Sequence, residues 1–155
     1  NITKYGLDGT LKWTRLLSEY GVAGLVQPLF FGERDELLFV RYTQDSVRYS
    51  KVNGSAGEMI WGRRYPMTDF GMEGDYPFTT PLNNGHVLVV GEPNHRVQED
   101  NWSMINSGGA ISFQGRLNFP NEELSRLSGI LEEDDGGFWS WWALIGRRPW
   151  LASDY

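Results

Sequence analysis

Tryptophan and arginine occur twice in this sequence at a spacing of two residues, as Trp13-x-Arg15 and Trp61-x-Arg63. An indole face can stack on the CH groups of a sugar ring, and a guanidinium fork beside it can donate hydrogen bonds to hydroxyl groups. These four residues are therefore candidate carbohydrate-binding side chains. Packing between neighbouring structural units is the alternative role, and it is favoured for Trp13 and Trp61 because large aromatic side chains are mostly buried.

A second aromatic cluster lies near the C-terminus, where residues 139–150 hold four of the seven tryptophans. Trp150 follows Arg147 and Arg148 and stands beyond the apolar run FWSWWA. This position predicts an exposed indole beside two guanidinium groups. Trp150, Arg147 and Arg148 thus join the candidate ligand-binding residues.

Residue types for catalysis or metal binding are sparse. The chain has no cysteine, and its two histidines are His86 and His95. No Gly-x-Ser-x-Gly turn accompanies them, so we expect no nucleophilic triad. The acidic run at 132–135 lacks the alternating spacing of a calcium-binding loop and is interpreted as a charged surface turn. The sequence predicts a non-enzymatic protein with no catalytic residue, no metal site and no cofactor.

The net charge and the sequence motifs limit the classes of partner that this chain is expected to bind. Acidic residues outnumber basic ones by 20 to 14, and the net charge of −6 argues against a nucleic-acid partner. No apolar run reaches the roughly 18 residues of a membrane span, so we expect no membrane span. Three Asn-x-Ser/Thr sequons, at Asn1, Asn53 and Asn101, are candidate glycosylation sites and indicate a secreted or extracellular glycoprotein.

The chain repeats itself with a period of about 50 residues. A polar segment, a Gly-bearing turn and a short apolar run end together at Trp13, Trp61 and Phe113, in steps of 48 and 52 residues. Apolar runs form a second landmark (LLFVRY, HVLVVG and FWSWWA), with steps of 50 and 52 residues. Two landmarks with one period indicate an internal structural repeat.

Each repeat predicts short strands joined by tight turns. An apolar run is followed by a polar turn, a strand such as VRYSKV, a Gly-rich turn such as NGSAGE, and a last strand such as MIWGRR. The runs LLFV, HVLVV and FWSWW are apolar on both faces, so we expect each sheet to be covered on both sides by like sheets. No segment has a convincing helical period, although residues 121–131 could hold one helical turn.

The repeats resemble those of quinoprotein-type (PQQ-type) β-propellers. The resemblance rests on TTPLNNGHVLVVG followed by WSMINSGGAISF, and on VQPLFFGERDELLFV followed by RYSKVNGSAGEMIW. It implies an all-β fold of three four-stranded blades, with units at about 25–66, 77–119, and 128–155 joined with 1–24. Asn53 stands near the family's Asp, and Ala56-Gly57 near its Thr-Gly. No complete quinone site is reproduced, so no such cofactor is expected.

Three blades are fewer than the four or more that propellers usually have. We therefore expect half a ring that closes by dimerisation into six blades, or part of a longer chain. The first and last segments would share a blade, which leaves no free edge strand. The alternative fold is a β-trefoil, also built from three repeats. In one repeat, Asp100-Asn101-Trp102 resembles the Gln-x-Trp pattern of ricin-type lectins.

These features predict a binding module. The first hypothesis is a secreted, lectin-like repeat protein with a glycan ligand. The second is a structural or protein-interaction propeller that forms a homo-oligomer or a larger assembly. A third is a fragment of a larger quinoprotein-like protein. The fold alone does not choose among them, because propellers carry many unrelated functions.

Overall fold

A computed structural model of the chain describes residues 1–22, 26–31, 34–70, 77–91, 99–118, 125–132 and 138–144. These residues form antiparallel strands and two short 3-10 helices, with no α-helix among them, so the all-β prediction is confirmed. The strands are β1 (Ile2–Tyr5), β2 (Leu11–Arg15), β3 (Gln27–Phe30), β4 (Glu36–Tyr42), β5 (Ser46–Asn53), β6 (Met59–Pro66), β7 (Phe78–Pro81), β8 (Val87–Val90), β9 (Glu99–Ile105), β10 (Ile111–Asn118), β11 (Ser125–Glu132) and β12 (Phe138–Leu144).

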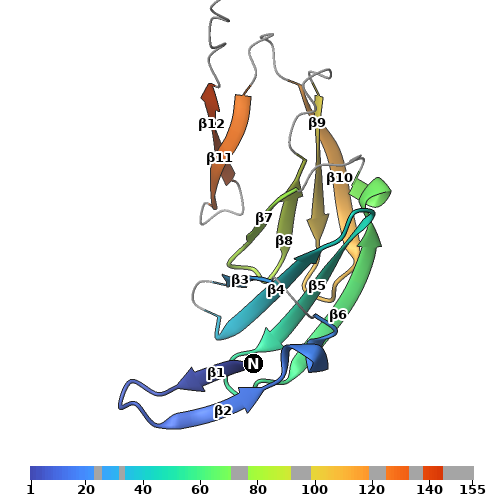
Figure 1. Cartoon of the computed structure of the whole chain (residues 1–155). Helices are drawn as coiled ribbons and strands as arrows, with labels where there is room; N and C mark the ends of the chain where they lie inside the picture. Colours follow the sequence, from blue (N-terminus) through green and yellow to red (C-terminus); the bar gives the residue numbers. More distant parts are fainter. Residues whose placement is uncertain are drawn as a thin grey trace, which may run out of the picture.

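The strands make four sheets that follow one another in chain order (Figure 1). Strands β3 to β6 form one four-stranded sheet and β7 to β10 another, each with its strands in sequence order. Both are meanders, because every strand pairs antiparallel with the next. The two sheets fall within the predicted units 25–66 and 77–119.

The remaining strands form two separate two-stranded sheets, β1–β2 and β11–β12, at opposite ends of the row (Figure 1). Among the described strands, the two segments of the third predicted unit, 128–155 joined with 1–24, therefore lie in different sheets. By the repeat, β1–β2 correspond to the third and fourth strands of a full sheet, and β11–β12 to the first and second. Each end of the row thus has a two-stranded sheet.

Residues 125–132 differ from the helical turn considered for 121–131. They form β11, which pairs antiparallel with β12. Because the hydrogen bonds of this strand come from residues more distant in the sequence, its local pattern gives little sign of the pairing.

Sheet β3–β6 is covered on both faces, as its apolar runs predict. Leu38 and Val40 of β4 belong to a buried cluster shared with β8 and β9 of the next sheet. Leu37 and Phe39, which alternate with them, belong to a second cluster that includes Trp13 of β2. Alternate residues of one strand face opposite sides of the sheet, so β4 is apolar throughout because it lies between two neighbours.

One 3-10 helix follows β2 and another follows β6. The first, η1 (Leu17–Tyr20), buries Tyr20, whose ring stacks on Phe39 at 5.5 Å. The second, η2 (Met67–Phe70), buries Phe70 against Tyr49. These helices bring the chain from one sheet to the next and close the edge of the core between them.

Candidate functional site

Trp13 of β2 packs against the turn between β5 and β6. Trp13 is 8% exposed, and its indole Nε1 donates a hydrogen bond to the carbonyl oxygen of Gly54 at 2.8 Å. A Cβ atom added at Gly57 would lie 2.8 Å from the ring, so the turn leaves room for glycine and no larger residue. Arg15 Nε donates to the Gly57 carbonyl at 3.4 Å. This Trp–Arg pair joins two sheets, and the indole is covered.

Trp61 of β6 repeats this arrangement one sheet further on. Its Nε1 donates to the carbonyl oxygen of Ser107 at 2.8 Å, and a Cβ atom at Gly109 would lie 2.9 Å from the ring. The same Cβ would be 3.2 Å from Arg63 Nε. We call the arrangement the indole–turn contact: a tryptophan on the fourth strand of one sheet lies against the Gly turn between the third and fourth strands of the next. Both tryptophans therefore pack between neighbouring sheets, which is the alternative to a carbohydrate-binding role.

A tyrosine hydroxyl completes each indole–turn contact. Tyr20 donates from its hydroxyl to the Gly57 carbonyl at 2.7 Å, and Tyr65 donates to the Gly109 carbonyl. Burial raises the pKa of Tyr20, and it raises the pKa of Tyr65 to about 12. The raised values follow because an ionised phenol is less well solvated between the sheets, so each hydroxyl keeps its proton and remains a donor.

Lys4 of β1 links the β1–β2 sheet to the turn between β3 and β4. Its Nζ lies 2.7 Å from Asp35 Oδ1 and donates to the Gly54 carbonyl at 3.0 Å. The hydrogen bonds from Lys4 and from Ser55 hold the pKa of Asp35 below its ordinary value. Gly54 therefore accepts two donors from the β1–β2 sheet, one from Lys4 and one from the indole of Trp13.

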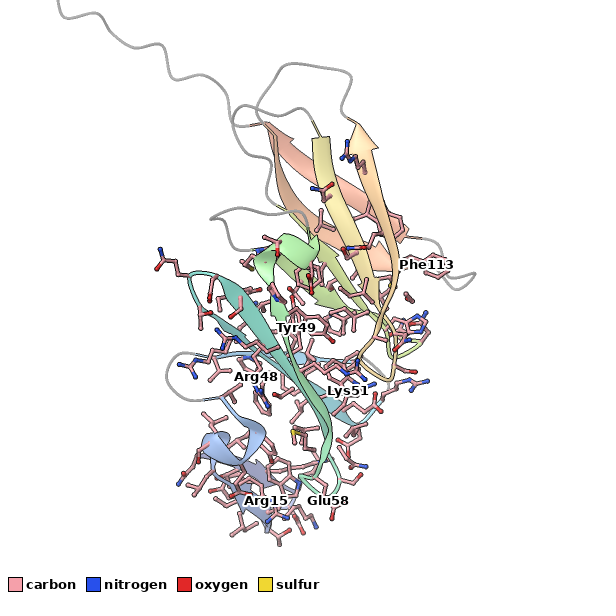
Figure 2. All side chains as sticks on the ribbon, turned by 90° about the vertical axis from the view of Figure 1, so that its right-hand side faces the viewer. Arg15, Arg48, Tyr49, Lys51, Glu58 and Phe113 are labelled. Atoms are coloured by element: carbon pink, nitrogen blue, oxygen red, sulfur yellow. The ribbon has the colours of Figure 1, made fainter. Side chains whose placement is uncertain are left out.

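Lys51 of β5 is the equivalent link between the two full sheets (Figure 2). It is 1% exposed and donates from Nζ to the Gly85 carbonyl at 3.2 Å. Its Nζ lies 2.8 Å from Glu36 Oε2 and 4.4 Å from the centre of the Phe31 ring. Glu36 Oε2 accepts no hydrogen bond of good geometry, so its contact with Lys51 is an ion pair. A buried cation is thus held by a carboxylate, a carbonyl and an aromatic face.

Two grooves are lined by described residues. The larger, of about 600 Å³, lies along β1 and is lined by apolar side chains of the first two sheets and by charged groups, including Tyr5, Phe30, Leu37, Arg34 and Asp35. The smaller, of about 420 Å³, lies between η2 and strands β9 and β10, and its lining includes Asp69, Asn101, Trp102, Gln114 and Arg116.

Part of the predicted site falls outside the described residues. This applies to Trp150, Arg147 and Arg148, and also to His95 and to 133–135 of the acidic run. Among the sequons, Asn1 and Asn53 are exposed, while Asn101 on β9 is half-buried. The side-chain oxygen of Asn53 accepts hydrogen bonds from the backbone of Ser55 and Ala56, which orders the turn that receives Trp13.

Within the described ranges, no three His, Asp or Glu side chains gather in a way that could hold a metal ion. No helix in the same ranges is both long and apolar enough to cross a membrane.

Comparison with known proteins gives no relative: no family model, no curated protein and no solved structure matches this chain.

The partners of the two tryptophans were not predictable from the sequence pattern. Gly57 and Gly109 are recognisable as turn residues, but their second role, leaving space for an indole from the preceding sheet, is not. One signal was present, since each tryptophan is followed by its partner glycine 44 or 48 residues later. No such signal marks Lys51, which stands in a polar segment and is nevertheless buried.

Proposed function

We propose that this chain is a structural, protein-interaction module: a row of propeller-type blades that binds further sheets at its two ends. The observation that carries the proposal is the repeated indole–turn contact. It joins sheet β3–β6 to a neighbour on each face, through Trp13 on one side and Trp61 on the other. Each end of the row, by contrast, has a two-stranded sheet.

The blade assignment is supported by topology. A propeller blade is a four-stranded antiparallel meander, and β3–β6 and β7–β10 are both of this kind. They pack face to face through a shared cluster, and the described strands form no closed barrel. These features favour blades over the β-trefoil.

Open edges give the module its means of binding. Among the described residues β1 pairs with β2 and with no other strand, so one of its edges offers free N–H and C=O groups. The larger groove lies along this strand, and Phe30 in its lining is 70% exposed. An edge strand beside exposed apolar side chains is suited to receive strands from another polypeptide. The proposal assigns the chain no catalytic step and no cofactor.

The solution mass tests this proposal. Light scattering on a gel-filtration column, at loadings from about micromolar to about millimolar, spans the affinities expected of protein–protein contacts. We expect a mass above the 17.7 kDa of one chain, increasing with concentration. A mass of one chain at the highest loading would contradict the proposal.

A glycan-binding role is the second candidate, and the smaller groove favours it. Trp102 and Arg116 come from paired strands, β9 and β10, and line this groove together with Asp69 and Gln114. An indole, a guanidinium and amide groups in one groove provide stacking and hydrogen bonds for a sugar ring. Calorimetry with a panel of oligosaccharides, repeated on Trp102→Ala, would detect the site. A flat response for every sugar would exclude this role.

A secreted location belongs to both candidates and rests on the three sequons. Asn1 and Asn53 are exposed, as glycan acceptors must be. Expression through a secretory pathway, followed by mass spectrometry, should show glycan mass on one or both residues. Unmodified asparagine at all three sequons would withdraw this support.

A further inference from the structure

The turn between β1 and β2 has the same backbone hydrogen bonds as the β9–β10 turn, which receives Trp61. Gly6 N–H donates to the Thr10 carbonyl, and Gly9 N–H donates to the Gly6 carbonyl. Asn106 and Gly109 have the same two bonds in the turn between β9 and β10. The φ angles agree too, +78° at Gly9 and +80° at Gly109, in the left-handed region that favours glycine.

The surroundings of these turns differ. A Cβ atom added at Gly57 or Gly109 would lie within 3 Å of an indole ring, whereas one added at Gly9 would meet no described atom within 4 Å. Leu7, in the same turn as Gly9, is fully exposed. The β1–β2 turn therefore has the shape of an indole–turn contact without its aromatic ring.

The opposite end of the row has an aromatic ring without a turn. Phe113 of β10 is 66% exposed and lies far from the end that holds Arg15 (Figure 2). Its place in the sheet matches that of Trp61, because Phe113 lies opposite Met104 on the third strand as Trp61 lies opposite Lys51. Within the described residues, no turn covers its ring.

We propose that a second copy of this chain docks head to tail, with Phe113 of one copy against the Gly9 turn of the other. The inference rests on the proposed function and names the partner. It has two internal precedents, since the same contact joins consecutive sheets at Trp13 and at Trp61. A second copy is the occupant because each end of this chain presents the part that the other end lacks.

The backbone supports the same docking. Placing β12 of one copy beside β1 of the other gives the strand order β11-β12-β1-β2, which is the order of both full sheets. In those sheets Leu38 lies opposite Lys51, and Leu88 opposite Met104. The repeat spacing then places Ser140 of one copy opposite Lys4 of the other. The groove along β1, about 600 Å³, is the space into which the two added strands would enter.

Symmetry sets the expected stoichiometry. A head-to-tail contact between two copies occurs twice when the ring closes, once at each junction. The product has two copies of each full sheet and two sheets completed across the junctions. We therefore expect a dimer of twice 17.7 kDa.

The test is the dimer dissociation constant of variants at position 113, measured by sedimentation equilibrium on the whole chain. Phe113→Ala should weaken the dimer at least about tenfold at each junction, as truncation of an aromatic anchor does. Phe113→Trp should tighten it by about fivefold, because the new indole N–H can donate to the Leu7 carbonyl of the other copy, as Trp61 donates to Ser107. Ile60→Ala is the matched control: Ile60 is also exposed on a fourth strand, but on β6 rather than on β10, so its dimer should be unchanged.

A double-mutant cycle tests whether Phe113 of one copy contacts the Gly9 turn of the other directly. Gly9→Ala should also weaken the dimer, and the combination with Phe113→Ala should be weaker by clearly less than the product of the two single effects, because both changes remove the same contact. Independent, multiplicative effects would overturn the docking. A dimer insensitive to position 113 would overturn it and leave the proposed function in place. A monomer at about millimolar concentration would overturn both.

Discussion

Trp61 lies so close to Gly109 that a Cβ atom added to the glycine would be 2.9 Å from the indole ring. Trp13 has the same relationship to Gly57, at 2.8 Å. Real Cβ atoms do not approach ring atoms this closely, so these glycines are required by the neighbouring sheet as well as by their own backbone angles. The contact makes the stacking of the sheets depend on residues almost 50 positions apart.

Alanine at these glycines should separate the two requirements. Gly109→Ala combines a positive φ with displacement of Trp61, and we expect a loss of about 2–4 kcal/mol in the free energy of unfolding. Gly9→Ala has nearly the same φ but no neighbour within 4 Å, so we expect about 1–2 kcal/mol. Urea unfolding at a dilution that keeps the chain monomeric measures both. Equal losses would mean that the indole does not restrict position 109.

Two donors share the Gly54 carbonyl, and their removal should be cooperative. Trp13→Phe keeps the ring but removes the indole N–H, at about 1 kcal/mol of unfolding free energy. Lys4→Met should cost less, because Lys4 is more exposed. In the double variant the carbonyl loses both donors, so the loss should exceed the sum of the single losses. Simple additivity in urea unfolding would show that the two bonds act independently.

Removing the buried cation should destabilise the junction between the full sheets. Lys51→Met deprives the Gly85 carbonyl of its donor and Glu36 of its closest cation, and we expect a loss of about 3–5 kcal/mol in the free energy of unfolding. Adding Glu36→Gln should restore part of the loss, because the unpaired carboxylate is then gone. Thermal or urea unfolding of the single and double variants measures this. A double variant less stable than Lys51→Met alone would contradict the ion-pair role.

Alkaline pH should loosen the same junction through Tyr65. Its folded-state pKa of about 12 lies above the ordinary value of 10.0, so its contribution to stability is complete below pH 10 and is lost as the pH rises from 10 to 12. Tyr65→Phe should flatten part of the decline in unfolding free energy over this interval. Burial also raises the pKa of Tyr49, so this residue should cause the remaining part of the decline. Tyr5→Phe, at an exposed tyrosine, is the control. An unchanged slope in Tyr65→Phe would contradict the raised value.

The candidate site was only partly visible in the sequence. The Trp–Arg pairs were correctly located on the last strand of their repeats, but their indoles are used for packing between sheets. No sequence pattern predicted that Lys51 and Tyr65 would contact the turns of the next sheet. Whether a side chain faces a neighbouring sheet depends on strand register, and a shift of one residue would move it to the other face.

The sequence by itself determined the strands, their turns and the period of about 50 residues. These follow from local rules: alternation of side chains along a strand, apolar runs, and glycine where φ must be positive. Only the tertiary structure decided that the first and last strands lie at opposite ends of the row, that Trp13 is covered and that Phe113 is exposed. Those outcomes depend on which sheet stacks on which, and stacking brings together residues that the sequence holds far apart.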